Sequence, residues 1–357
     1  RCPIGTGRAR AGNRFTEITL DSISQAALGA AVGVAVMGRS QPLWRSALAG
    51  AIVGTLPDLD VLIDKGDPVR NMVLHRAETH AFFWLALAAP LIAGVLVALQ
   101  RRRDLFKRTL LAVLAILFTH VLLDAVTVYG TRLGLPFTDH PFGLGALYIV
   151  DPMYTLPLLL GLLLAMHGDP RRGWRRNMAA LLFSTLYVGW AIAVQAHVTG
   201  VVRASPEAAG LPPERILVTP APLNTVLWRV VLVHEDRYQE GYYSLFDRLR
   251  EPGRPIRFEA FPRGGELEPL AAQIPAARLL ADFSHGFYAL SAENGALRIT
   301  DLRMGQHPNY VFSFLVAEYS SPVRPIEPRL VRQRLPLDPG LGWLGRRILG
   351  EDIDPPR

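Results

Sequence analysis

The first half of the chain consists largely of long apolar runs separated by short polar segments. A helix needs about 20 apolar residues to cross the roughly 30 Å hydrocarbon core of a bilayer. Four runs meet this requirement, and two earlier runs are shorter and rich in Gly and Ala, which favours close packing as a hairpin of short helices. The pattern predicts an α-helical integral membrane domain of about six helices, the first two short: 23–37, 43–56, 81–99, 110–128, 148–166 and 178–196.

The second half shows short β-rich runs and turns instead. "TVLWRVVLVHEDRYQEGYYSLF" places two such runs around a polar turn, which is typical of a β-hairpin. "FYALSAENGALRITDL" repeats the pattern, with Asn294-Gly295 suited to a type I′ turn. "YVFSFLVAEY" predicts another strand, and "ELEPLAAQIPAARLLADF" predicts short helices broken at Pro275. We therefore predict an N-terminal tail (1–20), a membrane domain (21–198) and an α+β soluble domain (199–357).

Composition agrees with this division. Half of the residues are hydrophobic and 19% are charged, with a mean hydropathy of +0.21. A chain of this composition is too apolar to be an ordinary soluble domain, and it carries too many charged residues to lie within the membrane over its whole length. The opening segment lacks the apolar run of a signal peptide. A single cysteine, Cys2, excludes an internal disulfide framework and a thiolate metal cluster.

The net charge of +7 comes mostly from arginines between the apolar runs. We interpret them as membrane topology signals, so no nucleic-acid partner is expected. Segments 39–45, 101–108 and 171–176 carry eleven basic residues, whereas the intervening segments 57–79 and 130–147 carry four. The bias predicts a multi-pass protein of the bacterial inner membrane, although the basic tail favours the opposite orientation. Segment 57–79 and the C-terminal domain are then periplasmic.

Two ionisable residues lie inside the apolar run 110–128, the fourth of the six predicted helices. His120 and Asp124 are four residues apart, so on a helix they share one face one turn apart. One interpretation is a structural hydrogen bond between packed helices. The other is a metal site, because an imidazole and a carboxylate at this spacing converge on one cation.

Segment 57–80 holds a denser group of ionisable residues. Asp58 and Asp60 follow Pro57, which favours a turned backbone that lets both carboxylates reach one site. His75 and His80 would lie about 140° apart on a regular helix, so either His75 precedes the helix or only one of them is a ligand. Arg76 suits an anion such as phosphate. Asp64, Asp67 and Glu78 are interpreted as solvated loop residues.

Asp21 and Asp151 are each predicted to cap a helix, at the start of the first and fifth helices. The predicted topology nevertheless places all these carboxylates and histidines at the outward helix ends, with His120 about one turn deeper. Residues with independent structural roles would not be expected to gather at one end of the helices. The pattern therefore predicts a carboxylate and histidine site for one or two hard or borderline metal ions.

Five motifs carry a family resemblance: "DSISQAALGAAVG", "GTLPDLDVL", "HRAETH", "THVLLDAVTVYGTRLGLPF" and "VDPMYTLPL". In order and spacing they resemble the YdjM-like (LexA-regulated) membrane-bound metal-dependent hydrolases, over about Asp21 to Leu160. "APLNTVLWRVV", "GYYSLFD" and "DLRMGQHPNYVFSF" resemble the C-terminal half of a long branch of that family. The resemblance implies a multi-pass inner-membrane protein with metal-dependent hydrolase activity.

The family's acidic motif falls on Asp58 and Asp60, and its H-x-x-x-D motif on His120 and Asp124. Its H-R-G-x-[ST]-H motif covers His75, Arg76 and His80, with Ala77 in place of Gly; Ala81 replaces the small hydroxyl residue that usually follows. Some relatives have a histidine where this chain has Gln25. The D-x-D and H-x-x-x-D elements are also similar to those of zinc-dependent phospholipase C, which implies a phosphoester substrate.

These observations lead to a mechanistic hypothesis. Zn²⁺, or else Mn²⁺ or Fe, is held as one or two ions by His80, His120, Asp124 and one of Asp58 or Asp60. The metal lowers the pKa of bound water from about 15.7 towards about 7. The other aspartate is the predicted general base, Arg76 the predicted phosphoryl-binding group and His75 a further catalytic candidate. Asp21, Gln25 and Asp151 are candidate supporting residues.

The expected partner is a membrane lipid or a lipid-linked substrate that reaches the site laterally, and the C-terminal domain is expected to form part of the entrance. The sequence identifies no protein partner. Two alternatives remain open. One is a transporter that uses His120 and Asp124 as a proton or cation relay. The other is a non-catalytic membrane scaffold that docks a periplasmic partner.

Overall fold

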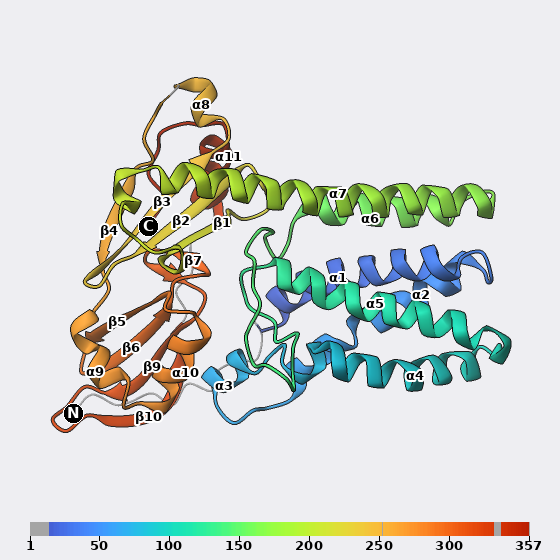
Figure 1. Ribbon diagram of the computed structural model, residues 1–357, viewed down its shortest axis with the longest axis horizontal. Helices are drawn as coiled ribbons and strands as arrows, with labels where there is room; N and C mark the ends of the chain where they lie inside the picture. The colour runs from blue at the N-terminus through green and yellow to red at the C-terminus, as the bar shows by residue number, and fades with distance from the viewer. Residues whose placement is uncertain (1–13, 252, 332–336, 357) are drawn as a thin grey trace.

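The computed structural model describes residues 14–251, 253–331 and 337–356. A bundle of helices is followed by a sheet-rich domain at one end of the bundle (Figure 1). This order confirms the predicted succession of a helical region and a sheet-containing domain. The long helices of the bundle are α1 (Arg14–Met37), α2 (Leu43–Thr55), α4 (Phe82–Leu99), α5 (Phe106–Val126), α6 (Pro152–Ala165) and α7 (Pro170–Arg203).

Among the described helices, three are long and apolar enough to cross a membrane. They are α4, α5 together with the short η3 (Arg103–Leu105) that precedes it, and α7. The apolar part of α1 (Ser22–Met37) and α6 are shorter, and α2 has 13 residues. The presence of six embedded helices therefore stays a prediction.

Several helix boundaries differ from the predicted ones. Helix α1 already includes residues 14–20, assigned above to a tail, because nothing in their sequence breaks a helix where the apolar run stops. Asp21 consequently lies within α1 and is not its N-cap, and its side chain is outside the described part of the structure. Helix α7 continues past residue 198 to Arg203, so it joins the two predicted domains without a break.

Helices α1 and α2 pack closely through glycines, as their composition predicts. A Cβ atom at Gly29 would lie 2.4 Å from the carbonyl oxygen of Gly50 and 2.9 Å from the Cα of Gly54. Only glycine fits such an approach of two backbones. Gly54 is near the end of α2, directly before the segment that carries Asp58 and Asp60.

The C-terminal domain contains two four-stranded antiparallel sheets. The first has the order β1 (Ile216–Pro220), β2 (Leu227–Val233), β3 (Arg237–Ser244), β4 (Phe258–Pro262), and the second β10 (Arg324–Leu330), β9 (Ser313–Glu318), β6 (Ala296–Asp301), β5 (Tyr288–Glu293). Strands β7 (Gly305–Gln306) and β8 (Asn309–Tyr310) form a small ribbon. The helices of this domain are α8 (Asp247–Arg250), α9 (Glu268–Ala271), α10 (Pro275–Phe283) and α11 (Leu337–Ile348).

The predicted local structures of this domain are confirmed. Strands β2 and β3 pair as one hairpin and β5 and β6 as the other. Asn294 and Gly295 have φ values of 53° and 72°, as a type I′ turn requires at both central positions. Pro275 begins α10, where the helical segment was expected to break.

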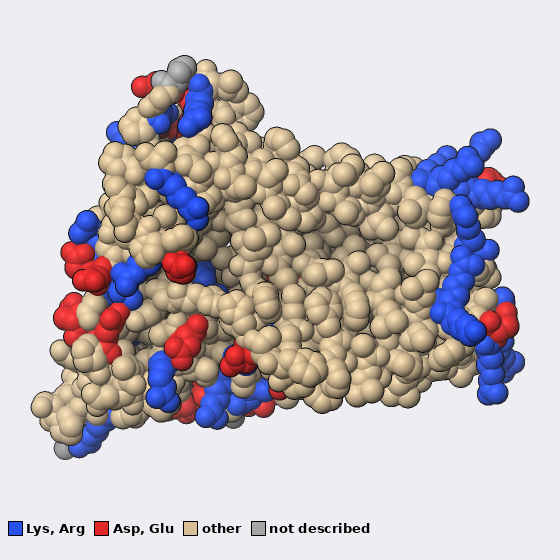
Figure 2. All heavy atoms as spheres, in the orientation of Figure 1, with Lys and Arg blue, Asp and Glu red and all other residues tan. Residues whose placement is uncertain are grey.

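The sheet-rich domain is packed firmly against the bundle. Val194 and Val198 of α7 share a hydrophobic core with Val218 and Trp228 of the first sheet. A second core joins Tyr129 to Phe283 of α10, and includes residues of the short α3 (Pro68–Val73). Lys and Arg side chains gather at the opposite end of the bundle, with a wide uncharged band between (Figure 2). The predicted basic loops therefore lie at the end away from the sheets.

Candidate metal site

Three segments bring ionisable side chains together at the end of the bundle that faces the sheets. The 3-10 helix η1 (Pro57–Leu62) follows α2 and carries Asp58. A second short helix, η2 (Glu78–His80), ends with His80 just before α4. His120 and Asp124 lie one turn apart near the end of α5. The side chains of His80, His120 and Asp124 are at most 1% exposed, and that of Asp58 is 13% exposed.

Four atoms of these residues form a compact group. His80 Nε2 lies 3.3 Å from Asp58 Oδ1 and 3.3 Å from Asp124 Oδ2. His120 Nε2 lies 3.5 Å and 3.2 Å from the same two oxygens, and 3.3 Å from His80 Nε2. Zinc bonds of about 2.0–2.1 Å in a tetrahedron place neighbouring ligand atoms about 3.3 Å apart. Five of the six separations have this length, and the sixth is below 4.8 Å.

The hydrogen bonds around the group define its protonation. His120 Nδ1 lies 2.7 Å from the carbonyl oxygen of Gly54, so this nitrogen must donate. The Thr79 hydroxyl donates to Asp60 Oδ2 across 3.0 Å and therefore accepts from His80 Nδ1 at 2.9 Å. We accordingly assign the proton of each neutral imidazole to Nδ1, which leaves both Nε2 lone pairs facing the group.

Two lone pairs and two carboxylate oxygens thus converge without a proton between them. Asp124 Oδ2 and Asp58 Oδ2 are buried and have no hydrogen-bond partner among the described residues. Such an arrangement is repulsive unless a cation, or an additional proton on an imidazole, lies inside it. The donor set of two imidazole nitrogens and two carboxylate oxygens is one that zinc accepts. The four residues therefore fit a metal ion.

The second oxygen of Asp124 is held by other groups. Gln25 Nε2 donates to Oδ1 across 2.9 Å, and Arg76 Nη2 lies 3.2 Å from the same atom. Arg76 is 3% exposed, its Nη1 donates to Thr127, and its guanidinium lies 5.2 Å from the ring centre of Tyr129. Arg76, expected to hold phosphoryl oxygens, here holds the Asp124 carboxylate.

Asp60 lies beside the group of four and orients it. Its Oδ2 accepts from the backbone N–H of Arg76 at 3.0 Å and from Thr79, while its Oδ1 lies 2.9 Å from His75 Nδ1. Arg76 has a φ of 61°, a left-handed conformation that is rare for a residue with a side chain. The backbone of this segment is thus held in an unusual turn that aims an N–H at Asp60.

The two aspartates are ionised for related reasons. In the metal-free protein a proton on Nε2 of His120 and His80 takes the place of the cation, and the contacts of Asp58 with these histidines then outweigh burial and bring the pKa of Asp58 well below its usual range. Burial would also raise the pKa of Asp60, and its pairing with His75 outweighs it and lowers that pKa. Both carboxylates are therefore charged at neutral pH, as metal binding requires.

The remaining predicted residues lie elsewhere. Asp151 is 1% exposed and caps α6, where its side chain accepts from the backbone of Met153 and Tyr154. Its Oδ2 also accepts from the Tyr187 hydroxyl at 2.9 Å, and it is not part of the group of four. The side chain of His75 is 22% exposed and lies outside the group too.

Sequence reasoning missed two contributors. Thr79 links His80 to Asp60, and the H-R-G-x-[ST]-H pattern contained this signal, because its hydroxyl position falls on Thr79. Gly54 orients His120 through a backbone carbonyl, which no side-chain pattern reveals. The first contact depends on how segment 57–80 folds back on itself, and the second on how the end of α2 packs against α5.

A bundle of apolar helices with two histidines and two aspartates buried at one end defines a membrane protein with a candidate metal-binding site. Residues 20–198, which are 179 of the 357 residues, match the family described as YdjM inner membrane protein. The chain belongs to this family, which confirms the resemblance seen in its motifs. No curated protein and no solved structure matches the chain.

Proposed function

We propose that this protein is a membrane-embedded, metal-dependent hydrolase that cleaves a phosphoester bond of a lipid-linked or amphiphilic substrate. One observation carries the proposal: His80, His120, Asp58 and Asp124 bring four ligand atoms together, and five of their six separations have the length expected in a tetrahedral zinc site. Zinc suits this donor set better than Mn²⁺, which prefers oxygen ligands in octahedral sites. A bound zinc ion would supply Lewis acidity and an activated water at neutral pH.

His75 is the proposed proton acceptor. Its Nδ1 pairs with Asp60, and with the proton on Nδ1 its Nε2 is left as the basic atom. His75 and Asp58 are the more exposed side chains around the group, whereas His80 and His120 are buried. The predicted general base is whichever of Asp58 and Asp60 does not hold the metal; with Asp58 in the group of four, Asp60 would act through His75, because its own side chain is only 3% exposed.

Apolar residues next to Asp58 support an amphiphilic substrate. Leu59, Leu62 and Ile63 are 52%, 78% and 53% exposed, and they belong to or follow the same short helix as Asp58. Such residues at the end of a membrane bundle can lie against the acyl chains while the aspartate faces a head group. The sheet-rich domain covers this end of the bundle (Figure 1), so we propose that it forms part of the entrance.

The basic residues support a periplasmic site. They gather at the end of the bundle away from the sheets (Figure 2), and basic loops favour the cytoplasmic side. We therefore propose that the metal group and the sheet-rich domain face the periplasm of a bacterial inner membrane.

A different observation favours a second candidate. Four protein ligands fill a tetrahedral zinc site, as in structural zinc sites, whereas catalytic sites usually keep one position for water. In that case the protein would be a scaffold stabilised by its metal. In a catalytic site, by contrast, one of the four ligands would have to leave its position to a water molecule. Asp58 is the most exposed of the four and is the residue that would do so.

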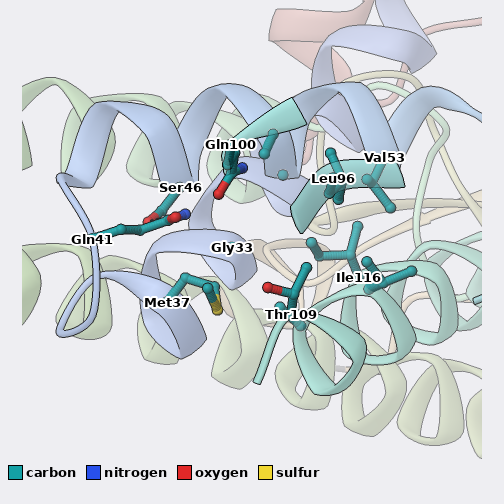
Figure 3. Close-up of a pocket in the computed structure, with 13 residues that line it drawn as sticks. Gly33, Met37, Gln41, Ser46, Val53, Leu96, Gln100, Thr109 and Ile116 are labelled. Carbon is teal, nitrogen blue, oxygen red and sulfur yellow. Dashed lines mark hydrogen bonds between the residues drawn. The ribbon is translucent and has the colours of Figure 1, made fainter. Parts of the chain in front are cut away.

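The transporter alternative has less support. A small pocket lies among α1, α2, α4 and α5 towards the basic end (Figure 3). Its volume of about 20 Å³ holds about one water. Its polar lining consists of Gln41, Ser46, Gln100 and Thr109, and no lining residue in this described part of the chain is ionisable. An ion pathway through a membrane is usually lined by ionisable groups.

Metal content and hydrolysis together test the proposal. The full chain, purified in a neutral detergent, should contain stoichiometric zinc and should release product from phosphoester lipids. His120→Ala should lose both. Protein without zinc, manganese or iron would refute the metal site, and full activity in His120→Ala would refute its catalytic role. Bound zinc without hydrolysis, together with unfolding of the metal-free protein, would favour the scaffold.

A further inference from the structure

Arg132 belongs to a segment that lies directly against the two histidine-bearing turns of the site. Its backbone N–H donates to the carbonyl oxygen of Arg76 across 3.0 Å, and the carbonyl of Leu133 accepts from the N–H of Phe82 at 3.1 Å. Residues 131–133 therefore run alongside residues 76–82. The adjacent Thr131 is also fixed, because it pairs with Phe142 in an antiparallel bridge.

The side chain of Arg132 has no protein partner among the described residues. Its Nε is buried without a hydrogen bond, and among the described residues its guanidinium forms no ion pair. The hydroxyl of Thr131 is fully buried and is likewise without a partner among these residues. A partly buried arginine without a counter-charge is costly for the free protein. It is the kind of group that an anionic ligand stabilises.

Arg76 is not available to bind an anionic ligand. It is buried and engaged with Asp124, Thr127 and the ring of Tyr129. An anion that recruited Arg76 would have to remove it from a metal-ligating carboxylate. Asp58, Asp60 and Asp124 together with Arg76 carry a charge of about −2, which one divalent ion would neutralise. Arg132 then provides the surplus positive charge that attracts an anion.

We propose that Arg132 is the residue that binds the anionic, phosphoryl-type oxygens of the substrate. This inference rests on the proposed function and names the anion-binding group of the same site. An arginine can hold two oxygens of a phosphate at once through its planar fork of N–H groups. The segment that follows it ends at Phe137, which is 80% exposed and lies 5.6 Å from the ring of Phe83. A head group at Arg132 thus has apolar surface nearby for a tail.

Direct binding measurements test this role without depending on catalytic activity. The full chain in neutral detergent is titrated calorimetrically with inorganic phosphate and with dihexanoyl phosphatidate, a soluble lipid that carries a phosphomonoester. Arg132→Gln should weaken the binding of both probes about tenfold or more. Arg132→Lys should lose less affinity for the probes, because it keeps the positive charge although it lacks the planar pair of N–H donors of the guanidinium. Arg70→Gln is the matched control, since Arg70 is 60% exposed on the same side of the bundle and pairs with Asp67.

The two probes distinguish the source of the phosphate. Equal binding of both indicates that the site recognises phosphate alone, whereas tighter binding of phosphatidate with the same loss in Arg132→Gln indicates a lipid head group. Wild-type affinity in Arg132→Gln, or no binding of either probe to the wild type, overturns the role of Arg132. Zinc content is measured on every variant. Absence of zinc from the wild type refutes the proposed function, while normal zinc with unchanged anion affinity in Arg132→Gln refutes only this inference.

Discussion

Arg303 Nη1, in the sheet-rich domain, donates a hydrogen bond across 3.0 Å to the carbonyl oxygen of Tyr129, just after helix α5, which carries the candidate ligands His120 and Asp124. Asp301 fixes Arg303 through a bidentate pair, with Nη2 2.7 Å from Oδ2. The ring of Tyr129 meets His75 edge to face at 5.9 Å, and its hydroxyl donates to the carbonyl of Met72. The sheet-rich domain is thereby connected to the turn that carries His75 and Arg76.

Arg303→Met should destabilise the protein by about 3–5 kcal/mol, because it leaves Asp301 buried without its counter-charge. Asp301 is fully buried. The double variant Arg303→Met with Asp301→Leu should recover part of this loss, since it removes both charges. Unfolding in detergent, followed by circular dichroism, measures the difference. Equal stability of the single and double variants would contradict this account.

The same pair of variants separates stability from site geometry. If Arg303 positions Tyr129, zinc affinity should fall about tenfold in both variants, at the lower end of the range seen when groups that orient metal ligands are removed. Recovery of stability without recovery of zinc affinity is the expected result. Wild-type zinc affinity in the double variant would mean that the contact only holds the two parts together.

His75 and His80, which lie in two successive turns of the chain, should behave differently. His80→Ala should abolish stoichiometric zinc binding, because His80 Nε2 belongs to the group of four. His75→Ala should retain the metal and lose activity, because His75 pairs with Asp60 outside the group. Elemental analysis of the two purified variants provides the comparison. Loss of zinc from His75→Ala would place this residue among the ligands instead.

Thr79 should affect zinc affinity without touching the metal. Thr79→Val keeps the shape of the side chain but removes the hydroxyl that joins His80 to Asp60. Zinc affinity should fall about 10–100-fold, as for the loss of other groups that orient metal ligands. Thr79→Ser keeps the hydroxyl and should bind zinc nearly as the wild type does. Competition with a chromophoric chelator gives both dissociation constants.

Close packing of α1 and α2 should also matter for the site. Gly29→Ala places a methyl group 2.4 Å from the Gly50 carbonyl oxygen, so it should separate the helices and destabilise the protein by about 1–3 kcal/mol. Because Gly54 packs on Gly29 and holds His120, zinc affinity should fall as well. Gly94→Ala in α4 is the control, since nothing lies within 4 Å of its added methyl. Equal thermal stability of the two variants would contradict the packing argument.

Sidedness can be tested with a reporter attached after the last residue. A periplasm-active phosphatase fused there should be active, and a reporter that fluoresces only in the cytoplasm should stay dark. Both results follow if the basic loops lie in the cytoplasm and the sheet-rich domain lies on the other side. The opposite pair of results would overturn both the orientation and the periplasmic position of the metal site.

Some features of this protein follow from the sequence because they depend on neighbouring residues. The apolar runs predict the bundle helices, and the spacing of His120 and Asp124 on one helix face predicts that they share a site. The β5–β6 hairpin follows from Asn294-Gly295, which accept the positive φ of its turn. These interactions span only a few residues, so the tertiary fold hardly changes them.

The tertiary structure alone decided the division of roles among the remaining groups. Asp58 and Asp60 are equivalent in the sequence, but the turns of segment 57–80 direct Asp58 to the histidines and Asp60 to Thr79 and His75. Arg76 is directed inward to Asp124, and a backbone carbonyl orients His120. Each of these contacts joins residues distant in the chain through irregular backbone. No local preference encodes such contacts, because their geometry is set only when the helices pack against one another.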